Sequence, residues 1–326
     1  MESSNESSGI SGNSGAKKIG AGILLSRLAG LLRESLLRSV LGLGPAADAF
    51  TAALRIPNLL QNLLGEGSLS SSFIPVYSKL LSEGKEKEAG DAAGAVASLL
   101  IAFTGALTLV GILIARPIAK ILTPGFTSEK LDLTADLIKI TTAGIGFLVL
   151  AAWCLGVLNS HRKFFLSYVA PVIWNAAQIV ILLIAINKDW DPARAAKAAA
   201  WGLFLGGIIQ LLFQFFGVVK LRTKTRFSFS WKNEHVREII KRFNPTILGR
   251  GVVQISAYFD LVLASLLVTG AVAALMSAQV LYILPISLFA MSIAASELPE
   301  MSRITDNQHL GTRLNQGIKQ TSFLML

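Results

Sequence analysis

The sequence predicts an all-α polytopic membrane protein. Residues of the types AVILMFWYC make up 52% of 326 positions, charged residues make up only 15%, and the mean hydropathy is +0.58. Four stretches of 20 residues or more carry no charge, at 92–115, 141–160, 164–187 and 198–219. About 20 apolar residues in a helix cross a hydrocarbon layer of roughly 30 Å. A water-soluble enzyme is therefore excluded as a class.

The predicted spans follow one another closely along the chain. The first 18 residues are rich in Ser, Gly and Asn and lack apolar periodicity, so we expect a disordered tail at 1–18. A charge-free stretch at 261–296 is too long for one span, and Thr269 and Gly270 offer a turn in its middle. We predict spans at 19–42, 46–65, 92–116, 133–159, 165–187, 195–220, 243–268 and 271–297, with a ninth beginning near Leu310.

The basic residues are distributed unequally between the two sides of these spans. The side that holds the N-terminus has 18 Lys and Arg residues in its connections, and the opposite side has 6. The positive-inside rule therefore predicts a cytoplasmic N-terminus. The basic connection at 221–242 either lies along the membrane and contacts anionic lipid head groups, or is an ordinary loop that fixes orientation. One-sided charge of this kind does not favour nucleic acid as a partner.

Cysteine and histidine give no sign of catalysis or metal binding. Cys154 is the only cysteine, which excludes an intrachain disulfide, and it lies inside an apolar stretch. His161, His235 and His309 are scattered through polar connections. We therefore predict neither a catalytic residue nor a metal site, and the chain is not expected to be an enzyme.

Charged residues inside the first two spans are the candidate binding groups. On a helix Glu34 and Arg38 each lie within about 20° of Arg27, whereas Arg33 lies roughly 120° away. In the second span Asp48, Arg55 and Asn62 are spaced seven residues apart and share another face. Each charge at a helix centre costs at least about 2.5 to 3.5 kcal/mol in a bilayer, so these groups need a polar environment.

Two environments satisfy that need. A hydrated cavity with an excess of arginine suits an anionic substrate, because guanidinium groups bind phosphates through paired hydrogen bonds. Alternatively, the arginines only hold the helices together by pairing with the acids nearby. The arginines are Arg27, Arg33, Arg38 and Arg55, and the acids are Glu34, Asp48 and Glu66.

Asp260 forms a second group of polar residues near the middle of the seventh span. Gln254 and Ser256 lie within two turns of it, and Arg250 lies nearer the end of the span. An acid at this depth is a candidate site for a coupling cation or proton. The alternative is that a basic residue elsewhere neutralises it.

These residues also carry a family resemblance. The segment SRLAGLLRESLLRSVLGLGPAADAFTAALRIPNLLQNLLGEGSLSSSFIPVYSKLL resembles the N-terminal signature of the MurJ/MviN family, the bacterial lipid II flippases. Further matches are TPGF at 123–126, LNSHRKF at 158–164 and NPTILGRGVVQIS at 244–256. The resemblance covers almost everything after the first 18 residues.

The resemblance implies a fold and a task. Members belong to the group of multidrug and polysaccharide flippases, with two six-helix lobes around a central cavity. For this chain it implies an N-terminal lobe at 19–220, a basic cytoplasmic connection at 221–242, and an incomplete second lobe at 243–326. The implied task is to move lipid II, an undecaprenyl diphosphate-linked peptidoglycan precursor, to the outer leaflet of the bacterial cytoplasmic membrane by alternating access.

The resemblance also implies the roles of individual residues. The substrate-binding residues that we predict are Arg27, Arg33, Asp48, Arg55, Asn58 and Glu66. Glu34, Arg250 and Gln254 would support the cavity, and Asp260 would bind a coupling cation such as Na⁺ or H⁺. No resident cofactor is expected. Possible further partners are anionic lipids and cell wall synthesis proteins.

Three features depart from the family pattern. Gln61 and Asn62 stand where members usually carry a basic pair, and Gln279 and Val280 stand where members usually carry an Asp-Arg pair. The sequence also stops inside its ninth predicted span, so it is either a fragment or borrows a second lobe. These departures leave other readings open: a polysaccharide-lipid flippase, a cation-coupled drug exporter, or a non-transporting homologue or fragment that acts as a cell wall scaffold.

Overall fold

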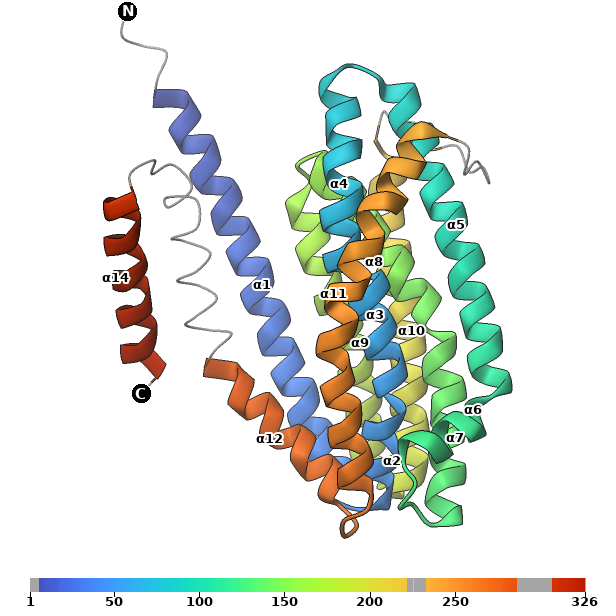
Figure 1. The fold of residues 1–326 in the computed structure, drawn as a ribbon. Helices are drawn as coiled ribbons and strands as arrows, with labels where there is room; N and C mark the ends of the chain where they lie inside the picture. The colour runs from blue at the N-terminus through green and yellow to red at the C-terminus, as the bar shows by residue number, and fades with distance from the viewer. Residues whose placement is uncertain (1–5, 222–224, 226–232, 286–306, 326) are drawn as a thin grey trace, which may run out of the picture. The chain divides into compact units, whose positions relative to one another are not determined.

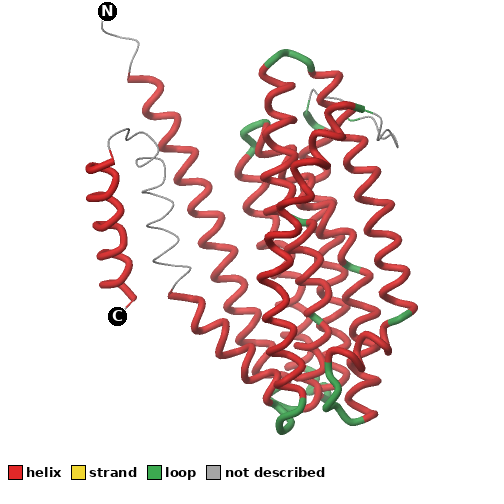
Figure 2. Tube along the Cα trace, viewed as in Figure 1, coloured by secondary structure: helices red, strands yellow, loops and turns green. Residues whose placement is uncertain are grey.

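The computed structural model describes residues 6–221, 225, 233–285 and 307–325, and every regular element among them is a helix (Figures 1 and 2). The all-α prediction is confirmed. The helices are α1 (Glu6–Leu41), α2 (Pro45–Ala53), α3 (Arg55–Leu64), α4 (Glu66–Ser82), α5 (Glu86–Leu113), α6 (Ala115–Leu122), α7 (Ser128–Ala143), α8 (Ile145–Ser160), α9 (Phe164–Asn187), α10 (Pro192–Val219), α11 (Glu234–Ser265), α12 (Ala271–Pro285) and α14 (Asn307–Met325).

Several of these helices are long and apolar enough to cross a membrane. Four qualify by length and composition, at Glu86–Leu113, Ser128–Ser160, Phe164–Asn187 and Pro192–Val219, and a bent fifth combines Glu234–Gly249 with Gln254–Ser265. These segments coincide with five of the predicted spans. Helix α1 does not qualify, because Arg27, Arg33, Glu34 and Arg38 interrupt its apolar sequence.

Three element boundaries differ from the predictions. Residues 6–18 continue helix α1 instead of forming a disordered tail, since extending an existing helix costs less than starting one. The predicted second span at 46–65 is broken at Leu54 and Gly65 and continues as α4 to Ser82. Helix α11 begins at Glu234 rather than 243, because the Asn233 side chain caps it by accepting the backbone N–H of His235 at 2.9 Å.

Contacts divide the chain into two units, 1–271 and 272–326. The core of the first unit is centred on α4, α5 and α8, where Phe73, Tyr77 and Trp153 are almost fully buried. The Trp153 indole N–H donates to the Ala93 carbonyl at 3.1 Å, which fixes α8 against α5. Gly156 lets α8 approach α4 closely, because a Cβ there would lie 3.2 Å from the Phe73 ring. The second unit contributes α12 and α14.

Candidate functional site

Helix α1 carries more positive than negative charge in its described part. Arg38 donates to Glu34 through Nε at 3.0 Å and Nη2 at 2.7 Å, and Arg33 lies 3.7 Å from the other oxygen of the same carboxylate. Arg27 is exposed, and no described carboxylate lies within 4.0 Å of it. Glu34 therefore contacts two of the three arginines, and helix α1 keeps an excess of positive charge at the depth of the predicted span.

Trp174 on α9 lies between Arg33 of α1 and helix α3. The Arg33 guanidinium carbon is 5.2 Å from the centroid of the Trp174 ring, a distance typical of cation–π contact. Trp174 also lines a hollow of about 20 Å³ together with Asn58 and Gln61 of α3. A hollow of this size holds a water molecule rather than a substrate head group. The structure therefore gathers Arg33 and Asn58 around one indole ring.

Two polar atoms near this region are buried without a described hydrogen-bond partner. They are Nη1 of Arg38 and Oδ1 of Asn175, which lies one residue after Trp174. A Cβ built on Gly30 of α1 would be 4.0 Å from the Asn175 oxygen, so α1 and α9 face each other here. Buried polar atoms normally have a hydrogen-bond partner. Nη1 of Arg38 can donate a hydrogen bond to water or to a polar ligand, and Oδ1 of Asn175 can accept one.

Asp48 lies in a different place from the arginines. It is 1% exposed, and its Oδ2 accepts hydrogen bonds from Lys130 Nζ at 2.5 Å and from the backbone N–H of Gly270 at 2.7 Å. Lys130 is also buried, and its ammonium lies 3.9 Å from the centroid of the Phe126 ring. Asp48 thus joins α2, the start of α7 and the turn that follows α11, at the end of the helices opposite to the α4–α5 turn (Figure 1).

Two glycines allow the backbones to approach at the same end. A Cβ on Gly125 would lie 2.1 Å from the Ser265 carbonyl oxygen, and a Cβ on Gly270 would lie 2.2 Å from the Leu43 carbonyl oxygen. Gly270 also has a φ of +97°, which side chains other than glycine rarely adopt. We call Asp48, Lys130, Gly125, Ser265 and Gly270 the clasp. The TPGF motif contributes Gly125 and Phe126 to this region.

Arg55 of α3 and Asp260 of α11 lie near each other where these two helices pack together. The Tyr258 hydroxyl donates to the Arg55 carbonyl at 3.2 Å, and the Arg55 guanidinium interacts electrostatically with the Asp260 carboxylate. Both side chains are partly buried. The nearby positive charge of Arg55 favours the interpretation in which a basic residue balances Asp260. No group of three or more His, Cys, Asp or Glu side chains suited to a metal ion occurs in the described part of the chain.

The structure therefore separates the predicted site residues into three places. Arg27, Arg33, Glu34 and Asn58 lie on or beside the α1–α3–α9 face, Arg55 and Asp260 lie at the α3–α11 contact, and Asp48 lies in the clasp. Gln254 is partly buried on α11. Glu66 begins α4 and Arg250 lies in α11, but their side chains are outside the described part.

Sequence reasoning missed Lys130, Trp174 and Tyr258 as members of these groups. Lys130 falls in the connection between the predicted spans at 92–116 and 133–159, whereas in the structure it lies in the first turn of α7. The described cationic partner of Asp48 is Lys130, which was not among the bases considered for it. Glu34 does pair with Arg33 and Arg38, but these pairs lie within α1 and so do not join two helices.

Comparison with known proteins identifies relatives of one family. The profile of the family described as lipid II flippase MurJ matches residues 37–326. A probable lipid II flippase MurJ of Bdellovibrio bacteriovorus is 32% identical over 309 residues, which are 94% of this chain and 58% of that protein. A protein of the same name from Rhizobium tropici is 30% identical over 313 residues, again 94% of this chain and 58% of that protein.

Solved structures give the same result. A lipid II flippase MurJ in an inward closed conformation superposes with a TM-score of 0.77 and 27% identity, covering 94% of this chain and 62% of that one. A MATE family multidrug transporter of the MOP superfamily in an inward-facing conformation superposes with a TM-score of 0.69 at 19% identity, covering 90% of this chain and 66% of that one, which shows the shared fold. The chain spans about 58% of the length of the curated relatives above. It is a multi-pass membrane protein that belongs to the lipid II flippase MurJ family.

Proposed function

We propose that the protein moves lipid II from the inner to the outer leaflet of the bacterial cytoplasmic membrane by alternating access. Family membership and the names of the relatives support this function. The observation that carries the proposal is the excess of guanidinium groups on α1, next to Trp174 and two unsatisfied buried polar atoms. A diphosphate is the part of lipid II that such a surface would bind.

The clasp supports a gating role in this cycle. It joins α2 and α7 to the turn after α11 through a buried ion pair, and the glycines leave no room for side chains between these backbones. In the proposed cycle the clasp keeps the outer end closed while the head group enters from the cytoplasmic end. Its opening then releases the head group outward, and the prenyl chain stays in lipid. This cycle needs no covalent chemistry.

Orientation, coupling and partners are further parts of the proposal. The 18 basic residues in the connections on the side of the N-terminus, against 6 on the opposite side, support a cytoplasmic location for the N-terminus and for the α4–α5 and α8–α9 turns. We propose that Na⁺ or H⁺ at Asp260 weakens its attraction for Arg55, which frees the guanidinium to bind diphosphate. The basic connection at 221–242 would contact anionic lipids, and cell wall synthesis proteins would receive the product.

The test is replacement of a host's own lipid II flippase by this protein, expressed from its complete reading frame. The expected result is restored growth together with lipid II that is accessible in the outer leaflet. Membrane abundance is measured in parallel, so that poor insertion is not mistaken for lack of transport. The proposal fails if the protein is abundant in the membrane and outer-leaflet lipid II stays at the depleted level.

One observation favours a second candidate, a non-transporting scaffold for cell wall proteins. Gln61 lines the hollow beside Trp174, and Asn62 next to it is exposed, so neither position offers a charge to a diphosphate. A scaffold would restore growth only when another flippase is present, and it would do so even with Arg33→Ala. A flippase would restore growth without another flippase, and Arg33→Ala would abolish that restoration.

A further inference from the structure

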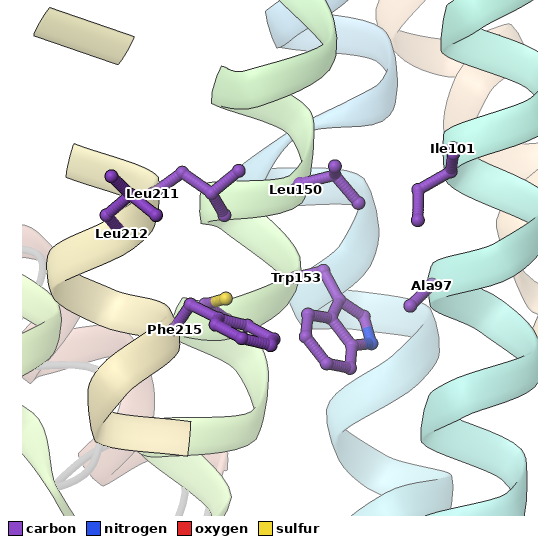
Figure 3. A pocket seen from close by; sticks show the side chains of 8 residues that line it. Ala97, Ile101, Leu150, Trp153, Leu211, Leu212 and Phe215 are labelled. Atoms are coloured by element: carbon purple, nitrogen blue, oxygen red, sulfur yellow. The ribbon is translucent and has the colours of Figure 1, made fainter. Parts of the chain in front are cut away.

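A crevice on the surface of the bundle lies apart from the charged residues described above. It has a volume of about 250 Å³ and is lined by eight apolar side chains of α5, α8 and α10 (Figure 3). Ala97 and Ile101 of α5 form one wall, and Leu212 and Phe215 of α10 form the other. Leu150 and Trp153 of α8 lie between the labelled side chains of α10 and those of α5 (Figure 3).

The floor of the crevice is rigid and apolar. Trp153 and Cys154 of α8 are 2% and 0% exposed and belong to the main core. The indole N–H of Trp153 is already bonded to the Ala93 carbonyl, so only apolar ring atoms remain for an occupant. Ile101 and Leu212 are 46% and 48% exposed, which opens the crevice toward the outside of the bundle. The space therefore suits a hydrocarbon and would stay empty of water.

The position of the crevice along the spans defines which part of a lipid reaches it. All three helices belong to segments that are able to cross a membrane. Phe215 precedes Lys220 by five residues, or about 7.5 Å, and Ala97 follows Lys87 by ten residues, or about 15 Å. Half of a hydrocarbon layer is about 15 Å thick, so the crevice occupies the half of the membrane next to the basic turns.

Basic residues lie at the ends of α8 and α10 that follow the crevice residues along these helices. Lys220 caps α10, and Arg162 and Lys163 form the turn after α8. The two helix ends are adjacent, because a Cβ on Gly217 would lie 3.2 Å from the Leu158 side chain. All three basic residues are exposed, and no described carboxylate lies within 4.0 Å of them. Their charge complements the phosphate of an anionic phospholipid.

We propose that this crevice binds one acyl chain of an anionic phospholipid, whose phosphate lies at Lys220, Arg162 and Lys163. The site is separate from the clasp and from the α1 arginines, so it is a lipid site of the scaffold rather than a part of the transport pathway. Van der Waals contact with the rigid floor and attraction at the mouth distinguish the bound lipid from lipids that only surround the protein.

The experiment uses the full chain in vesicles that contain phosphatidylglycerol with a photoreactive diazirine in the middle of one acyl chain. After illumination, mass spectrometry of peptides locates the attached lipid. We expect attachment to Leu150, a half-buried residue of α8 that lies between the two walls of the crevice. Ile101→Phe, at an exposed wall position, is expected to reduce this attachment to background, and Ala97→Leu provides a second way to fill the crevice.

Leu109→Phe is the matched control, since Leu109 is 60% exposed on the same helix and outside the crevice. It is expected to leave attachment at Leu150 unchanged. Lys220→Gln is expected to remove the preference for labelled phosphatidylglycerol over labelled phosphatidylcholine. The proposal is overturned if attachment occurs only at outer positions, if it persists in Ile101→Phe and Ala97→Leu, or if excess undecaprenyl phosphate abolishes it. The last outcome would assign the crevice to a prenyl chain.

Discussion

Arg33 differs from the other arginines of α1 in what its guanidinium contacts. It lies over Trp174 and shares Glu34 with Arg38, so it is positioned without being fully neutralised. We expect Arg33→Ala to abolish rescue of a flippase-depleted host, because a charge-assisted hydrogen bond of about 1.5 to 3 kcal/mol is lost. Arg33→Lys keeps the charge but lacks the planar fork, so rescue should be partial.

Membrane abundance distinguishes binding from structure in that experiment. Both Arg33 variants are expected to reach the wild-type amount in the membrane. Arg242→Ala is the control, since Arg242 is half exposed and pairs with Glu238 near the start of α11. If Arg33→Ala lowers abundance instead, its role is to hold α1 against α9.

The buried pair of Asp48 and Lys130 predicts a large effect on stability. Lys130→Met removes the described cationic partner of the Asp48 carboxylate, which is 1% exposed. We expect the free energy of unfolding to fall by about 3 to 5 kcal/mol, and less in the double variant Asp48→Asn, Lys130→Met. Denaturant unfolding in detergent measures both. Lys197→Met is the control, because Lys197 forms a half-exposed ion pair with Asp136. We expect this variant to lower the free energy of unfolding by about 1 kcal/mol or less. Equal effects of the two single variants would contradict the prediction.

His161 gives the protein a pH dependence that is independent of transport. It lies in the turn after α8, and its Nε2 is 3.1 Å from the Tyr77 hydroxyl. Burial, assisted by Lys163, lowers the pKa of His161 below its ordinary value of 6.5 in the folded protein. The unfolded chain then binds this proton more readily, so the contribution to stability is full above pH 6.5 and is lost as pH falls toward the folded pKa.

The melting temperature between pH 8 and pH 5 tests this dependence. His161→Gln keeps a hydrogen-bonding group for Tyr77 but does not titrate. We expect this variant to show a smaller decrease in melting temperature over the range than the wild type. An identical pH profile for the two proteins would mean that other groups cause the decrease.

At the scale of elements, the turn between α11 and α12 depends on one glycine. Gly270→Ala places a Cβ 2.2 Å from the Leu43 carbonyl at a φ of +97° and shifts the N–H that Asp48 accepts. We expect a lower melting temperature. Gly249→Ala inside α11 is the matched control, because open space surrounds that position, and alanine there should stabilise by about 0.5 to 1 kcal/mol. A neutral Gly270→Ala would show that the turn relaxes without loss.

Element ends were predicted well where composition alone decides them. The apolar spans at 165–187 and 195–220 coincide with α9 (Phe164–Asn187) and α10 (Pro192–Val219) within three residues. The prediction failed for α4 and for the start of α11, because these segments are polar enough to be read as connections. Hydropathy reports where lipid lies, whereas hydrogen bonds and caps such as Asn233 decide where a helix begins.

For the whole molecule, the excess of basic residues at one end predicts a single orientation. Cys154 is buried, so the natural thiol should not react with an added reagent. In right-side-out vesicles an impermeant maleimide is expected to label Ser128→Cys at the start of α7, and to label Ser82→Cys at the end of α4 only after permeabilisation. Both serines are exposed, which makes the two variants a matched pair. Labelling in the opposite order would reverse the proposed orientation.

The sequence by itself determined that this is a helical membrane protein of a flippase family with surplus arginine in its first span. It did so because apolar length, charge and motif spacing are local properties. Only the tertiary structure decided how the charges are used. The break at Leu54 interrupts the face that Asp48 would have shared with Arg55, and the partners of Asp48 lie 82 and 222 residues away. Contacts between such distant positions depend on how helices pack, which residue spacing within one helix does not specify.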